Sequence, residues 1–123
     1  MVEGKFIEGN RPMVPALIAW GQAIQNPYFI LDTGFTGDLQ VTPQIAKDLG
    51  LELNTVTNAQ IATGEIVPVR SGVAFAVMGE EKIYVTVLVS EGMPLLGISF
   101  LEKFKYKAIV DCKNKTVQLE VVN

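Results

Sequence analysis

The sequence lacks histidine and has a single cysteine, Cys112, among its 123 residues. Without histidine, the nucleophile–imidazole pairs of serine and cysteine hydrolases are excluded, and so is the commonest metal ligand. One thiol can form neither a disulfide within the chain nor a zinc site, so we expect Cys112 to be a structural thiol at the end of a strand. We therefore expect no bound metal and no cofactor.

Clustered positive charge and long apolar runs are also missing. The net charge is −3, and the ten lysines and arginines are scattered, so we expect no nucleic-acid partner. The densest basic stretch, Lys103, Lys105 and Lys107, alternates with aromatic residues and is interpreted as a solvated face. The apolar stretches are far shorter than a membrane span, and residues 1–5 carry no signal-peptide core. We expect a cytoplasmic protein without a membrane partner.

What is present indicates one domain, residues 1–123, built mostly from short strands. Apolar residues alternate with period two over residues 73–77 and 83–89, with a tight turn at 79–80, which is typical of antiparallel sheet. We also expect strands at 5–7, 14–20, 38–41, 106–111 and 116–121, and one that ends at Asp32.

Two short helices complete the predicted architecture. Residues 42–50 carry a capping Thr42, a proline at the first helical position and a terminating Gly50. The second helix is expected over residues 99–104. The pattern predicts a mostly β chain that forms a closed or half-closed barrel with one or two short helices.

The sequence Asp32-Thr33-Gly34 is the clearest chemical signal. It follows the apolar run Tyr28-Phe29-Ile30-Leu31, so a buried strand ends on an acid, and Gly34 then permits a turn. A carboxylate at that point is costly to bury alone, which indicates a functional site. A second apolar run, Leu95-Leu96-Gly97, precedes the second predicted helix.

Together these elements resemble the retroviral-type (retropepsin-like) aspartic protease family, which pairs an Asp-Thr-Gly loop with a later hydrophobic-hydrophobic-Gly and a short helix. The resemblance extends from about Val14 to Leu119 and implies a retropepsin-like (acid protease) barrel. It implies that Asp32 is the catalytic acid and that Thr33 hydrogen-bonds across a dimer. It also implies that Gly34 lets the backbone approach the catalytic acids.

The resemblance further implies a β-hairpin flap that closes over bound peptide. By position this flap is expected over residues 60–68. Its tip is expected at Ala62, Thr63 and Gly64, which lie between two predicted strands.

Peptide hydrolysis by carboxylates needs two acids that share a proton, and this chain offers one suitable acid. Its four aspartates are Asp32, Asp38, Asp48 and Asp111. Only Asp32 has the Thr-Gly continuation; Asp38 is expected in a loop or at a strand entry, and Asp111 at the start of a turn. The second acid must therefore come from a second copy, and a two-fold homodimer places identical loops face to face. We expect a homodimeric aspartic endopeptidase that acts on a peptide or protein substrate.

Several residues depart from the retroviral pattern. Phe35 replaces a small residue, Thr36 and Gly37 replace substrate-binding acids, and Ile98 replaces an arginine that pairs with one of those acids. Because the arginine and its acid partner are absent together, the chain resembles the single-domain aspartic proteases of prokaryotes. The main alternative is a non-catalytic retropepsin-like module for dimerisation or peptide binding. An ordinary Asx-type turn at Asp32 and a small β-barrel for an apolar ligand also remain open.

Overall fold

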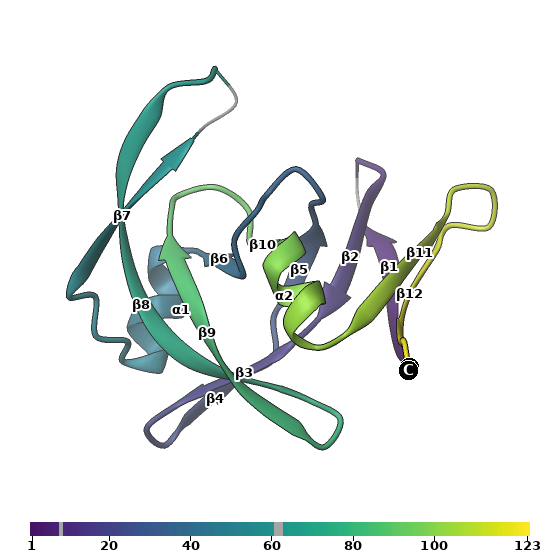
Figure 1. The fold of residues 1–123 in the computed structure, drawn as a ribbon, viewed down its shortest axis with the longest axis horizontal. Coiled ribbons are helices and arrows are strands. Elements are labelled where there is room, and N and C mark those ends of the chain that lie inside the picture. The colour runs from purple at the N-terminus through teal and green to yellow at the C-terminus, as the bar shows by residue number, and fades with distance from the viewer. Residues whose placement is uncertain (8, 61–62) are drawn as a thin grey trace.

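The structure, a computed structural model, describes residues 1–7, 9–60 and 63–123. The chain is mostly β, with two short helices, α1 (Pro43–Leu49) and α2 (Ile98–Lys103) (Figure 1). The strands are β1 (Val2–Ile7), β2 (Arg11–Pro15), β3 (Leu17–Trp20), β4 (Ala23–Gln25), β5 (Tyr28–Leu31), β6 (Leu39–Val41), β7 (Thr55–Gln60), β8 (Ile66–Met78), β9 (Glu81–Val89), β10 (Leu95–Leu96), β11 (Tyr106–Asp111) and β12 (Thr116–Val121).

The strands form one sheet in the order β11-β12-β1-β2-β5-β10-β6-β9-β8-β3-β4, and β7 pairs with β8 beside this path. The sheet curves around the core without pairing its end strands β11 and β4, as the described residues show (Figure 1). Most neighbours are antiparallel, but β10 runs parallel to β5, and β6 runs parallel to β9. The predicted mostly β architecture is confirmed in its half-closed form.

The predicted single strand at 14–20 is wrong, because the chain changes partner in the middle of it. β2 pairs with β5, whereas β3 pairs with β8. Ala16 lies between them, 1% exposed, and its N–H donates to the carbonyl oxygen of Pro27 at 3.2 Å. A continuous apolar run gives no signal of such a change, because both strands bury the same kind of side chain.

Strand alternation places the core on one face of the long strand β8. Ala74, Ala76 and Met78 are buried, whereas Val73 is 45% exposed on the opposite face. The paired strand β9 alternates in the same way, with Val85 and Val87 turned into the core. The second face of this part of the sheet is therefore partly exposed to solvent.

The two helices begin and end close to where the sequence predicts. The Oγ1 atom of Thr42 accepts a hydrogen bond from the Ile45 N–H at 3.2 Å, and Gly50 ends α1 with a φ of 68°. Helix α2 begins at Ile98, one residue earlier than expected. Cys112 directly follows β11, at the strand end where we expected it, and its side chain is exposed. None of the helices in the described part of the chain is long and apolar enough to span a membrane.

Candidate active site

The two sequence motifs meet where β10 lies between β5 and β6. β10 is parallel to β5 on one side and antiparallel to β6 on the other. Asp32 directly follows β5, and its N–H donates to the carbonyl oxygen of Leu96 at 3.0 Å. Residues 32–38, here called the Asp32 loop, must therefore pass over the end of β10 to reach β6. That crossing places the loop on Gly97.

Backbone hydrogen bonds hold the Asp32 loop against the start of α2. Gly97 N donates to the Asp38 carbonyl oxygen at 2.9 Å, and Ile98 N donates to the Phe35 carbonyl oxygen at 2.9 Å. A Cβ on Gly97 would collide with the carbonyl oxygens of Gly37 and Phe35 and would lie 2.7 Å from the Phe35 ring. A Cβ on Gly37 would also lie 2.7 Å from that ring. The Phe35 ring therefore fits because residues 37 and 97, which lie against it, are both glycines.

The carboxylate of Asp32 lies at the surface of this loop and is half-buried. Its Oδ1 accepts a hydrogen bond from Gly34 N at 2.9 Å, which is the one side-chain hydrogen bond of Asp32 within the described residues. This bond makes an Asx-type turn, which is the turn that the sequence left open as an alternative for Asp32. Thr33 and Gly34 are exposed in the single chain. The second carboxylate oxygen accepts no hydrogen bond from the described residues.

Asp32 lines a cleft of about 1050 Å³. The opposite wall is the hairpin of β7 and the first half of β8, which projects from the sheet (Figure 1). Thr57 pairs with Val69, and Ala59 pairs with Val67, and all of these residues line the cleft. The cleft therefore has two aspartates in its floor and a hairpin above it that presents both polar and apolar side chains.

The hairpin occupies the position expected for the flap. Ala62 lies outside the described residues. Thr63 is exposed, and its Oγ1 accepts a hydrogen bond from Glu65 N at 3.4 Å. Gly64 has a φ of 87° and lines the cleft, and its carbonyl oxygen accepts a hydrogen bond from Gln60 Nε2 at 3.3 Å.

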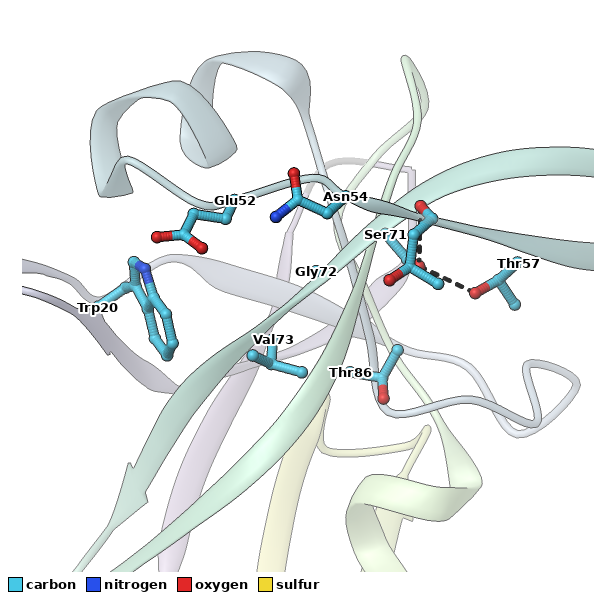
Figure 2. A pocket seen from close by; sticks show the side chains of 9 residues that line it. Trp20, Glu52, Asn54, Thr57, Ser71, Gly72, Val73 and Thr86 are labelled. Carbon is cyan, nitrogen blue, oxygen red and sulfur yellow. Dashed lines mark hydrogen bonds between the residues drawn. The ribbon is translucent and has the colours of Figure 1, made fainter.

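A second, smaller pocket lies beside the cleft (Figure 2). It is bounded by Trp20, Glu52 and Asn54 and by the outward face of β8 and β9. Sequence reasoning missed it, because the register of β8 and β9 assembles it from segments that are distant in sequence.

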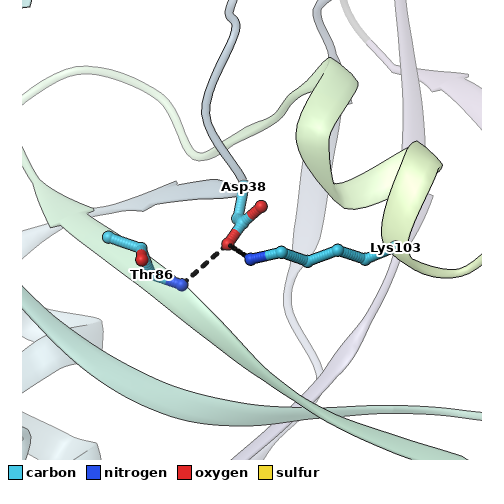
Figure 3. A network of polar contacts seen from close by, with 3 residues as sticks. All are labelled: Asp38, Thr86 and Lys103. Atoms are coloured by element: carbon cyan, nitrogen blue, oxygen red, sulfur yellow. Dashed lines mark hydrogen bonds and ion pairs between the residues drawn. The ribbon is translucent and has the colours of Figure 1, made fainter.

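Sequence reasoning also missed an ion pair in the floor of the cleft. Asp38 is 4% exposed, and its Oδ2 accepts hydrogen bonds from Lys103 Nζ at 2.6 Å and from Thr86 N at 2.8 Å (Figure 3). Its Oδ1 is buried and has no hydrogen-bond partner among the described residues. Lys103, Lys105 and Lys107 are all exposed, as expected for a solvated face, but Lys103 also pairs with Asp38, which the sequence did not predict.

The Asp38–Lys103 pair ties the Asp32 loop to both β9 and α2. The one local signal was an acid directly before the buried strand β6, since such an acid needs a partner. The described residues contain no cluster of three or more potential metal ligands of the histidine, cysteine or carboxylate type.

The fold is similar to solved structures of aspartic proteases. A retropepsin-like aspartic protease from Rickettsia conorii superposes with a TM-score of 0.69 at 21% identity, covering 97% of this chain and 89% of that chain. EIAV protease in complex with the inhibitor HBY-793 superposes with a TM-score of 0.62 at 19% identity, covering 84% of this chain and 96% of that chain. No protein-family model and no curated protein matches the sequence. This chain has the fold of the retropepsin-like aspartic proteases.

Proposed function

We propose that this protein is a homodimeric aspartic endopeptidase in which Asp32 of each chain forms a catalytic dyad. The observation that carries the proposal is the position of the Asp32 carboxylate at the cleft and its small number of hydrogen bonds. Its carboxylate faces a cleft large enough for a peptide and accepts one intramolecular hydrogen bond among the described residues. The retropepsin-like fold supports the same assignment.

The need for a second copy follows from the chemistry of the cleft. The other acid that lines it is Asp38, and the ammonium group of Lys103 neutralises it at 2.6 Å. Asp38 is therefore unsuited to share a proton with Asp32. Thr33 and Gly34 are exposed beside Asp32, where a second copy related by two-fold symmetry can contact them.

In the proposed reaction, the two Asp32 carboxyl groups hold one proton between them, as is general for aspartic proteases. The ionised carboxylate takes a proton from a bound water as the water oxygen adds to the scissile carbonyl carbon. The protonated carboxyl gives its proton to the carbonyl oxygen, which yields a gem-diol. The C–N bond then breaks, the amine nitrogen takes up a proton, and the carboxylic acid and amine products leave.

The hairpin is proposed to cover the bound peptide as a flap, with its tip at Ala62, Thr63 and Gly64. Among the hairpin side chains that line the cleft, Ala59, Val67 and Val69 are apolar, so we expect the cleft to accept apolar substrate side chains near the scissile bond.

The decisive test is the Asp32→Asn variant, which we expect to abolish hydrolysis in a peptide-library assay while the chain stays folded. The matched control is Asp48→Asn, which makes the same change on α1, where Asp48 is exposed. Equal cleavage by the Asp32→Asn variant and the wild type would refute the catalytic assignment. Peptide binding without any hydrolysis by the wild type would instead indicate a peptide-binding module.

A dilution series tests the dimer separately. Because one chain supplies one acid, the activity per chain should rise with protein concentration until dimers saturate. Full activity of a sample that sedimentation shows to be monomeric would exclude the shared dyad.

A further inference from the structure

The pocket beside the cleft has a volume of about 400 Å³ and lies between the segment 52–55, β8 and the end of β3. Figure 2 shows Glu52 above the Trp20 indole at one end and Thr57 and Ser71 at the other. Thr57 Oγ1 and Ser71 Oγ lie 2.9 Å apart and are hydrogen-bonded, and Ser71 is 2% exposed. That end of the pocket is therefore fixed to the base of the hairpin.

This pocket adjoins the cleft. Thr57 and Thr86 line both. On β8, Val69 faces the cleft and Val73 faces the pocket, and both project from the same face of the strand because they are an even number of residues apart. Strand geometry separates them by roughly 13 Å, which an extended peptide spans with about four residues. A peptide that leaves the cleft along this face is therefore long enough to reach the pocket with about four residues.

The lining of the pocket selects a cationic, planar group. Glu52 is the one charged residue among its lining residues, and it is exposed. The indole of Trp20 offers an aromatic face beside it, and the remaining polar groups are hydroxyls and the Asn54 amide. A guanidinium group can stack on the indole and pair with the carboxylate at the same time, whereas an ammonium group lacks the plane for stacking.

We infer that this pocket is an extended substrate subsite that binds an arginine side chain outside the residues held over Asp32. The inference rests on the proposed peptidase function for its biological use, but its binding step requires no hydrolysis. Thr86 connects the two regions, because its side chain lines the pocket while its N–H donates to Asp38 in the Asp32 loop at 2.8 Å.

Trp20 is the single tryptophan of the chain, so the indole signal reports on this pocket alone. The probe is an alanine-rich peptide with one arginine, and the comparison is the same peptide with citrulline, which has a similar shape but no charge. In the Asp32→Asn background, which prevents cleavage, the arginine peptide should shift the indole N–H resonance and quench Trp20 fluorescence in a saturable way.

The variant that removes the charge of the pocket is at Glu52. Glu52→Gln should weaken binding of the arginine peptide about tenfold, the loss expected from an ion pair coupled to a stacked cation. Glu102→Gln, the same change at an exposed position on α2, should leave binding unchanged. An equal response to the citrulline peptide, or equal affinity of the Glu52→Gln variant, would overturn the subsite.

A second measurement keeps this inference separate from the proposed function. In the active protein, an arginine is moved one residue at a time away from the scissile bond, and kcat/KM is divided by that of the citrulline peptide. The ratio should peak at one spacing in the wild type and in Glu102→Gln, and flatten in Glu52→Gln. A flat ratio in a cleaving wild type would refute the subsite alone, whereas saturable binding without cleavage would refute the peptidase and retain the pocket.

Discussion

The Asp32 loop and the turn after Asp111 begin in the same way and end differently. Each starts with an aspartate at the end of a strand whose Oδ1 accepts the N–H two residues later, from Gly34 at 2.9 Å and from Lys113 at 3.0 Å. At Asp111 the carboxylate also accepts hydrogen bonds from the backbone and the side chain of Asn114, at 3.0 and 2.8 Å. The Asp111 carboxylate therefore accepts three hydrogen bonds within the chain, whereas the Asp32 carboxylate accepts one from the described residues.

The difference shows how the fold can hold a strand-end loop without using the carboxylate that begins it. The turn after Asp111 depends on its own carboxylate for stability, so that carboxylate is occupied. The Asp32 loop is held instead by backbone bonds to residues 96–99 and by the Asp38–Lys103 pair. Because these contacts carry the stability of the loop, the carboxylate of Asp32 need not.

The largest expected effect comes from breaking that pair. Lys103→Met should leave Asp38 buried without its counter-ion and lower the free energy of unfolding by about 3 kcal/mol, measured by urea denaturation. Adding Asp38→Asn to this variant should restore much of the loss, because it removes the buried charge.

The matched control is Lys107→Met. Its ion pair with Glu120 is 3.8 Å long, and the lysine side chain is 60% exposed, so its loss should cost no more than about 0.5 kcal/mol. If the two lysine variants were equally stable, the Asp38–Lys103 pair would not support the Asp32 loop.

A smaller effect is expected where the loop crosses β10. Gly97→Ala should destabilise the fold by about 1–3 kcal/mol, because its Cβ would collide with the carbonyl oxygens of Gly37 and Phe35. Gly92→Ala is the control, since the nearest atom to its Cβ would be Gln40 Nε2 at 3.8 Å and its φ is ordinary. Equal thermal denaturation midpoints for the two variants would show that the crossing yields without strain.

The sequence predicted what local patterns encode. Period-two alternation gave the strands β8 and β9, the caps Thr42 and Gly50 gave α1, and the Asp-Thr-Gly loop with the late glycine indicated the fold. Asp111 was correctly expected at the start of a turn, where its carboxylate accepts hydrogen bonds from nearby backbone amides.

The sequence could not predict contacts made at long range. Asp38 and Lys103 are 65 residues apart, and many surface lysines have the same local surroundings. The pocket of Trp20 and Glu52 depends on strand register, which no single segment specifies. The separation of β2 from β3 was missed for the same reason, since partner choice is a property of the whole sheet.

The smallest effect tests the other side of the comparison. Hydrogen bonds from Asn114 and Lys113 to Asp111 lower the pKa of that carboxyl from its ordinary value of 3.8. The folded chain therefore binds this proton less readily than the unfolded chain, so the stabilisation is complete above the unfolded pKa and is lost as the pH falls through the folded pKa. Asp111→Asn should be slightly less stable than the wild type at neutral pH, and the gap should close below pH 3.8 in urea titrations.

The same substitution at Asp32 should have a smaller effect on stability than at Asp111. Asp32→Asn also loses the negative charge that accepts the N–H of Gly34, but backbone bonds to Leu96, Gly97 and Ile98 still hold that loop. Its free energy of unfolding at neutral pH, measured at a concentration where the chain is monomeric, should therefore fall less than that of Asp111→Asn. A larger loss for Asp32→Asn would mean that the carboxylate itself stabilises its loop, and the distinction between a structural and a reactive strand-end acid would fail.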